Sequence, residues 1–434
     1  AYEISLFQTI LFGIFGVGAL IGLFVFATHT GNTSSNVVGT VVIWGTLPKE
    51  GMQSTLIAAG QTETLLRNVS YVQKDPQSLA SDLASAIATG SAPDLILASQ
   101  EQLHALAKFI ATIPLATLPA RTFESSFIEE GRIFAIPGGG GYYGVPFLLD
   151  PLVLFSNHSI LASNGIARPP ATWEALTGLV PQIAQLTPSR QVGRGLIALG
   201  TYNNVHDARG ILSALFLQTG IPVSGYSPTG VLAADLGDVS NVSSPGHAVL
   251  GFYTQFTDPS KVSYTWNASL PDSQQAFLSG DLALYLGYVS EARFLRAANP
   301  NLDFEVTPLP QPATATIKKT YGLVYAFMIP RGSKNASGAY QAAALLSNAA
   351  PQAIAAANTG LAPAALSQLG TLPVDPIAAV AHSGALYASG WLSPAPEDTD
   401  TVFSGMINDV ISGRSNVQAA LANAERSLSS LLQQ

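Results

Sequence analysis

The chain has 434 residues, more than one hydrophobic core usually supports, so we expect two lobes. It contains no cysteine, which excludes disulfides, thiol catalysis, Cys-rich metal sites and a lipid anchor on an N-terminal cysteine. The net charge is −8, and only 11% of the residues are charged, with no basic cluster along the chain. Nucleic acid is therefore not an expected partner.

An apolar run begins the chain. The segment Ile4–Ala27 contains no Lys, Arg, Asp or Glu. As a helix at ~1.5 Å per residue it is long enough to cross a hydrocarbon layer of ~30 Å. No basic residue precedes it, so we expect that a basic leader has been removed. We predict a hydrophobic helix over residues 1–27. Gly18 and Gly22 form a small-xxx-small pair, so the helix is either a single anchor with incidental glycines or packs against copies of itself.

Strand and helix patterns alternate after a short polar linker at residues 28–36. Such alternation predicts an α/β fold with a parallel sheet covered by helices on both faces. Ligands of these sheets bind beyond the carboxyl ends of the strands, so Trp44, Gln100 and Glu101 are candidate site residues. The predicted strands are Val37–Trp44, Val69–Gln73 and Asp94–Ala98, and the predicted helices are Met52–Arg67, Leu79–Ala88 and Gln100–Phe109.

A glycine-rich turn at Gly138–Gly141 contains a formal G-x-G-x-x-G match from Gly139 to Gly144. The segment Tyr143–Phe155 that follows is long, strand-like and contains proline, so the match does not open a helix. We interpret it as a hairpin turn. The last third of the chain is rich in alanine, and helices are predicted at Gly338–Ala350, at Pro351–Ala357 and from Thr401 to the end.

The usual signatures of catalysis and metal binding are absent from the sequence. Its six histidines are scattered, with no H-E-x-x-H motif and no pair at metal-binding spacing. There is no G-x-S-x-G elbow. We therefore predict no enzymatic activity, no metal site and no cofactor.

Six Asn-x-Ser/Thr acceptor sites occur along the chain. They indicate a glycosylated surface outside the cytoplasm, or they reflect the high Ser and Thr content by chance. The acceptor residues are Asn32, Asn68, Asn157, Asn241, Asn267 and Asn335.

Several segments follow one another in an order typical of one protein family. They are Ser91–Asp94 (SAPD), Gly131–Asn157, Arg168–Leu176 (RPPATWEAL), Phe277–Glu291 (FLSGDLALYLGYVSE), Phe304–Pro310 (FEVTPLP) and Gly322–Ser347. With them the chain resembles the extracellular solute-binding proteins of ABC importers, in particular the carbohydrate-binding group similar to maltose-binding protein. The resemblance covers about residues 37–350.

The resemblance implies a two-lobed, periplasmic-binding-protein-like fold with hinge strands, in which the solute lies between the lobes. Lobe I would comprise residues 37–148 plus 284–331, and lobe II residues 149–283 plus 332–434. The implied partners are a small solute, expected to be a sugar or oligosaccharide, and an ABC importer permease.

A sugar site needs polar partners for hydroxyls and flat aromatic rings for C–H faces. Asp150 and Glu291 would either bind hydroxyls or brace a hinge, and Trp44 would either line the cleft or pack in the core. Asn203 and Asn204, which follow a predicted strand, would form a polar rim, although Asn204 could instead cap a helix. The residues that the resemblance brings to the cleft are Trp44, Gln100, Glu101, Tyr142, Tyr143, Asp150, Tyr288, Glu291 and Tyr325.

The N-terminal helix without a basic flank is similar to the products of pilin-type (class III) leader cleavage in archaea. Two hypotheses stay open. In the first, the helix tethers a solute receptor to the membrane. In the second, the helices bundle into the core of a filament and the globular heads lie outside. Both hypotheses predict a location on the extracellular face of the cell envelope.

Overall fold

The computed structural model describes residues 38–434 with the exception of residue 228. The predicted N-terminal helix with Gly18 and Gly22, the linker at 28–36 and the acceptor Asn32 lie outside the described residues. Within residues 38–434, no helix combines the length and the apolar character needed to cross a membrane.

The described residues form one 11-stranded mixed sheet and a two-stranded hairpin, β7 (Val223–Tyr226) with β8 (Leu232–Asp235). Strands β1, β2 and β3 run parallel, as predicted, and β6 also runs parallel to β9. The central strands β11 and β4 are antiparallel to each other, β11 is antiparallel to β3, and β4 is antiparallel to β9. The order in the large sheet is β2 (Val69–Gln73), β1 (Val41–Gly45), β3 (Leu95–Ser99), β11 (Thr320–Met328), β4 (Gly144–Asn157), β9 (Leu282–Tyr288), β6 (Val192–Ile197) and β5 (Gln185–Leu186). Three short strands lie off this path: β10 (Phe304–Pro308) and β12 (Ala362–Pro363) pair with β4, and β13 (Ala388–Ser389) pairs with β11.

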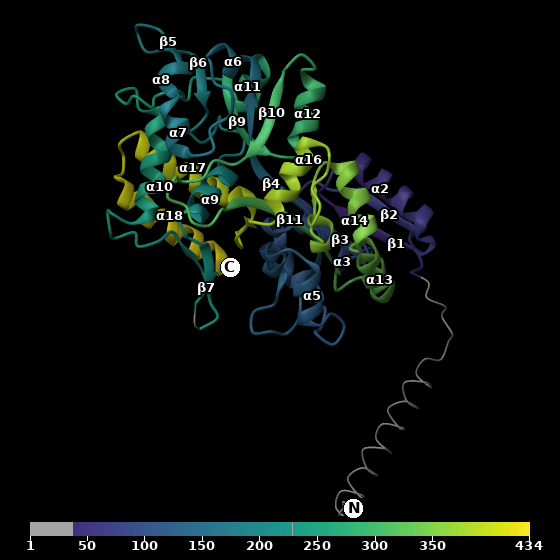
Figure 1. Ribbon diagram of the computed structural model, residues 1–434. Helices are drawn as coiled ribbons and strands as arrows, with labels where there is room; N and C mark the ends of the chain where they lie inside the picture. Colours follow the sequence, from purple (N-terminus) through teal and green to yellow (C-terminus); the bar gives the residue numbers. More distant parts are fainter. Residues whose placement is uncertain (1–37, 228) are drawn as a thin grey trace, which may run out of the picture.

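Strand β4 crosses from one lobe to the other. All 14 of its residues are buried. Its first part, as far as Pro151, pairs with β11, and its second part, from Leu152, pairs with β9 and β10. Figure 1 shows the two halves of the molecule meeting at β4 and β11. The long strand predicted at Tyr143–Phe155 is thus a shared strand of both lobes.

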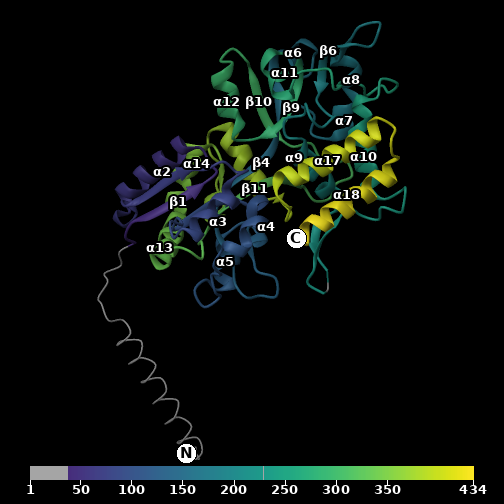
Figure 2. The ribbon, with the colours of Figure 1, turned by 180° about the vertical axis from the view of Figure 1, so that it is seen from behind.

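Lobe I contains β1, β2, β3, β11 and the first half of β4. The three strands β1, β2 and β3 alternate with helices, and the helices α13 and α14 come from a distant part of the chain to pack on β1 and α2 (Figure 2). The helices of this lobe are α2 (Lys49–Thr62), α3 (Leu79–Ala88), α4 (Leu103–Leu106), α5 (Ala120–Ser126), α13 (Ala336–Leu346), α14 (Ala349–Thr359) and α15 (Leu366–Leu369).

Lobe II contains the second half of β4 with β9, β10, β6 and β5. Helix α16 (Pro376–Ala385) contacts β4, β10 and β12 where the lobes meet. The other helices of this lobe are α6 (His158–Ser163), α7 (Trp173–Gly178), α8 (Val180–Ile183), α9 (Ala208–Gln218), α10 (Pro245–Thr254), α11 (Ser273–Ser279), α12 (Glu291–Ala298), α17 (Pro396–Ile411) and α18 (Val417–Leu432).

The contacts assign some segments differently from the predicted lobe boundaries. The prediction gives residues 284–331 to lobe I, but β9 and β10 within that range pair with the second half of β4. It gives residues 332–434 to lobe II, but α13 and α14 pack on lobe I. The number of passages between the lobes is three in both cases, but the second lies between β10 and β11 and the third between α15 and α16. These two passages are connecting segments without a sequence signal of their own.

Local elements agree well with their predicted ranges. Strand Val69–Gln73 and helix Leu79–Ala88 have the predicted bounds. Helix α3 ends just before Gly90, which has a φ of 68° and so adopts the left-handed conformation that glycine favours. The predicted C-terminal helix is two helices, α17 and α18, separated at Gly413, which has a φ of 70°.

Candidate functional site

A pocket of about 880 Å³ lies between the lobes. We call it the interlobe pocket. Lobe I contributes the turn from β1 into α2 and the end of α14, the two central strands contribute Asp150 and Tyr325, and lobe II contributes the start of α12. The lining residues are Thr46, Leu47, Pro48, Glu50, Gly51, Ser54, Asp150, Ser290, Glu291, Arg293, Phe294, Tyr325, Asn358, Thr359 and Leu361. Three of the predicted site residues, Asp150, Glu291 and Tyr325, are therefore brought together.

Asp150 lies at the middle of β4, where the strand passes between the lobes. Its side chain is 4% exposed, and Oδ1 accepts a hydrogen bond from the Ser290 N–H at 3.1 Å. Burial raises the pKa of the Asp150 carboxyl to about 7, although the hydrogen bonds from Ser290 oppose this shift. Near neutral pH the carboxyl can thus occur in a form that donates a hydrogen bond and in a form that only accepts.

Tyr325 supplies an aromatic ring from β11. Its ring is half-buried and forms part of the pocket wall. Burial raises the pKa of the Tyr325 hydroxyl well above its usual range, so the hydroxyl stays protonated and can donate. Phe294 from α12 adds a second, half-exposed ring, with 51% of its surface accessible.

Glu291 is held by three hydrogen bonds at the start of α12. Its Oε1 accepts from the Tyr288 N–H at 2.6 Å, and its Oε2 accepts from Gln274 Nε2 at 2.6 Å and from the Tyr285 hydroxyl at 2.5 Å. These bonds tie α12 to α11 and to β9, while the side chain also lines the interlobe pocket.

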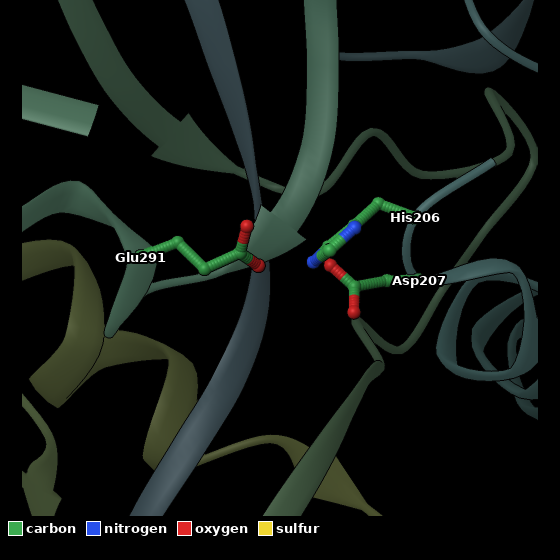
Figure 3. A group of neighbouring side chains, drawn as sticks. All are labelled: His206, Asp207 and Glu291. Atoms are coloured by element: carbon green, nitrogen blue, oxygen red, sulfur yellow. The ribbon is translucent and has the colours of Figure 1, made fainter. Parts of the chain in front are cut away.

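The carboxylate of Glu291 faces Asp207 and His206, as Figure 3 shows. One ligand atom from each of the three side chains lies within 4.8 Å of the others. Burial, followed by the nearby Glu291 charge, raises the pKa of Asp207 well above its usual range, which indicates that this carboxyl holds a proton. Glu291 already accepts three hydrogen bonds from protein donors, so its carboxylate does not need a metal ion to balance its acceptors.

Gln100 and Glu101 follow β3 but do not line the interlobe pocket. Gln100 is fully buried; its Nε2 donates to the Gly322 carbonyl at 2.8 Å and its Oε1 accepts from the Val324 N–H at 2.8 Å, so it ties β3 to β11. Glu101 accepts two hydrogen bonds from the guanidinium of Arg209, both at 3.0 Å, and one from the Tyr321 hydroxyl at 2.7 Å.

Three of the predicted aromatic site residues lie outside the interlobe pocket, each in different surroundings. Trp44 is half-buried on one face of β1, with Lys74 Nζ 3.9 Å from the centre of its ring. Tyr142 is 5% exposed and stacks on Phe123 at 4.0 Å. Tyr143 lines a separate groove of about 720 Å³ with Tyr226. These three residues are not among those that line the interlobe pocket with Asp150, because strand alternation and turns send their side chains to different faces.

The remaining candidates stabilise lobe II. Asn203 is exposed and accepts a hydrogen bond from Ser404 at 2.9 Å. Asn204 donates to two loop carbonyls, those of Asn267 and Leu270, both at 3.0 Å, so it braces a loop and is not a helix cap. Tyr288 packs closely on Gly210, where an added Cβ would lie 2.6 Å from the tyrosine hydroxyl.

The five described acceptor asparagines differ in accessibility. Asn68 and Asn241 are exposed. Asn157 is 5% exposed and caps α6 by accepting from the Ile160 N–H, so the folded chain does not present it to a modifying enzyme. Asn335 and Asn267 are half-buried, and their amide groups donate to the Val38 carbonyl and the Tyr264 hydroxyl.

Sequence reasoning missed Arg209 and Asp400. Arg209 Nη1 lies 2.5 Å from Asp400 Oδ2 in α17, while the same guanidinium contacts Glu101 in lobe I. The three residues are far apart in the sequence, and their only shared signal is that charged residues are rare in this chain.

Two α/β lobes joined by shared strands around a polar pocket define the class of two-lobed binding proteins, which close on small molecules by hinge motion. Residues 56–372 match the bacterial extracellular solute-binding protein family, and the chain belongs to this family. The predicted family is thus confirmed. Its members bind solutes and are not enzymes, and the family indicates a location outside the cytoplasm.

Solved structures of similar fold cover most of the chain. The cyclic alpha-maltosyl-1,6-maltose binding protein from Arthrobacter globiformis is 15% identical, with a TM-score of 0.71 over 91% of this chain and 99% of its own. A cyclo/maltodextrin-binding protein in complex with maltotetraose is 15% identical, with a TM-score of 0.72 over 93% of this chain and 99% of its own. The GacH receptor of Streptomyces glaucescens, solved unliganded and with acarbose, is 18% identical, with a TM-score of 0.67 over 91% of this chain and 98% of its own. No curated protein sequence is similar enough to match.

Proposed function

We propose that the protein binds a sugar or oligosaccharide in the interlobe pocket and delivers it to an ABC importer. The observation that carries this proposal is the meeting of Asp150 and Tyr325 in a pocket bounded by both lobes. Such a pocket can be completed by closure of the lobes on a small molecule. The structures of similar fold support a carbohydrate, since they are a cyclic maltosyl-maltose binding protein, a cyclo/maltodextrin-binding protein with maltotetraose, and a receptor in complex with acarbose.

The chemistry of the pocket suits a polyhydroxylated solute. The rings of Tyr325 and Phe294 can cover C–H faces, while the Asp150 carboxyl and the Tyr325 hydroxyl can pair with sugar hydroxyls. Among the described residues that line the pocket, one guanidinium occurs, that of Arg293, and it donates to the carbonyls of Ala357 and Asn358. A solute that needs a free cationic partner is therefore a poorer fit than a neutral one.

The apolar run Ile4–Ala27 supports attachment of the receptor to the cell envelope. Tethering through a membrane helix is the simpler proposal, and assembly through Gly18 and Gly22 into a pilin-like filament is the alternative. Electron microscopy of the purified full chain separates them: monodisperse particles in detergent support a tether, and filaments support the alternative. Glycan occupancy is proposed at Asn68 and Asn241.

A thermal-shift screen tests the binding proposal. A ligand that binds only the folded chain raises the melting temperature. A free ligand concentration of 100 times the Kd adds about 2.7 kcal/mol to the free energy of unfolding. We expect at least one member of a panel of mono- and oligosaccharides to raise the melting temperature of the wild type. Tyr325→Ala should abolish the shift, because it removes a pocket ring. Tyr340→Ala, which alters a half-buried tyrosine on α13 outside the pocket, should retain it. Shifts by amino acids or peptides but by no sugar would contradict the sugar assignment.

A further inference from the structure

We propose that Glu101 and Arg209 form a latch that joins the lobes directly and controls access to the solute site. This inference rests on the proposed function, since it concerns how that site opens and closes. Glu101 lies in the short 3-10 turn that follows β3 in lobe I, and Arg209 lies in the first turn of α9 in lobe II. The ion pair therefore links the edges of the two lobes that face each other.

The geometry of the pair is bidentate. Arg209 Nε and Nη2 donate to the two carboxylate oxygens of Glu101, both at 3.0 Å. The side chain of Glu101 is 4% exposed and that of Arg209 is 22% exposed, so solvent screens the pair only weakly. Paired, parallel hydrogen bonds between guanidinium and carboxylate are among the stronger polar contacts in proteins.

Each partner is held in place by its own lobe. On the lobe I side, the Tyr321 hydroxyl donates to Glu101 Oε1 at 2.7 Å. On the lobe II side, Arg209 Nη1 donates to Asp400 Oδ2 at 2.5 Å, and the Tyr202 hydroxyl donates to Asp400 Oδ1 at 2.5 Å. Because both side chains are already ordered, forming the latch costs little additional side-chain entropy.

Opening of the lobes would separate a buried carboxylate from its guanidinium. Breaking a charge pair of this kind is costly, because each charged group must then regain water or find another partner. The latch therefore shifts the equilibrium between open and closed lobes toward the closed form, and solute entry requires that the pair separate. Removing the latch should favour the open form.

Distance measurements between spin labels test the latch without any solute. The chain has no native cysteine, so Gln61→Cys on α2 and Val262→Cys in lobe II are the only labelling sites, and both positions are exposed. We expect Arg209→Leu to lengthen or broaden the label distance distribution, with a shift of more than ~2 Å in its mean. The matched control is Arg132→Leu, which removes an exposed arginine paired with Glu124 within lobe I and should change nothing.

A second variant keeps the test decisive if Arg209→Leu fails to fold. The double variant Glu101→Gln, Arg209→Leu removes the ion pair without leaving a buried unpaired carboxylate at position 101, and it should give the same open distribution. A distribution equal to that of the wild type in the folded latch variants would overturn the proposal. Since no sugar is added, failure of the latch is distinguishable from failure of sugar binding, which the thermal-shift screen reports.

Discussion

Glu291→Ala is expected to lower the free energy of unfolding by about 2–4 kcal/mol, because it removes the acceptor of three hydrogen bonds. The donors left without a partner are the Tyr288 N–H, the Tyr285 hydroxyl and Gln274 Nε2. They belong to β9 and α11, so the loss loosens the start of α12 where it borders the interlobe pocket. Urea unfolding followed by circular dichroism measures the change.

A matched control separates this network from a general effect of losing a carboxylate. Glu305 is an exposed glutamate on β10, and Glu305→Ala should change stability by less than ~0.5 kcal/mol. The free energy of unfolding of Glu291→Gln should fall between those of Glu291→Ala and Glu305→Ala, since an amide retains one acceptor oxygen but presents an NH₂ group to at least one donor. Equal stability of Glu291→Ala and Glu305→Ala would show that the hydrogen bonds contribute nothing.

Glu130→Gln is expected to stabilise the protein increasingly as the pH rises from about 5 to 8. Glu130 is 9% exposed, and no group within the described part of the chain forms a hydrogen bond with its Oε1. Burial raises its pKa from 4.5 to about 8, while the Gly390 N–H and Lys319 act in the opposite direction. The folded chain therefore holds a proton that the unfolded chain has released, and the wild type loses stability as the pH rises through this window.

The expected gain at pH 8 is on the order of 1–4 kcal/mol, because each unit of pKa shift corresponds to about 1.4 kcal/mol. Below pH 4.5 the carboxyl is protonated in both states, and the difference between variant and wild type should be small. Chemical denaturation at pH 4, 5, 6, 7 and 8 measures this difference. Glu129→Gln, at the exposed neighbouring position, should show no such trend. A difference for Glu130→Gln that does not change with pH would contradict the assignment of the raised pKa to this group.

Local structure could be predicted from the sequence because short-range rules decide it. Strand Val69–Gln73 is rich in β-branched and aromatic residues, and helix Leu79–Ala88 has apolar spacing with a glycine stop at Gly90. The family was identified in advance by ordered motifs, and three of the predicted site residues line one pocket.

The rest of the site depends on contacts between distant segments, which sequence patterns do not encode. The sequence separation is 108 residues between Glu101 and Arg209 and 191 residues between Arg209 and Asp400. Trp44 lies one residue before the end of β1, close to its predicted place, but this determines only the position of the backbone. The side chain follows the alternation of the strand and points to a sheet face beside Lys74.

Calorimetric titration of the full chain with the same saccharide panel tests sugar binding between the lobes most directly. We predict one binding site per chain for at least one sugar. In Asp150→Leu we predict loss of measurable binding, because an apolar side chain replaces the carboxyl that would pair with sugar hydroxyls in the pocket. Glu305→Ala, outside the pocket, should bind as the wild type does. Heat from no sugar in the panel, or equal affinity in the wild type and Asp150→Leu, would contradict sugar binding in the interlobe pocket.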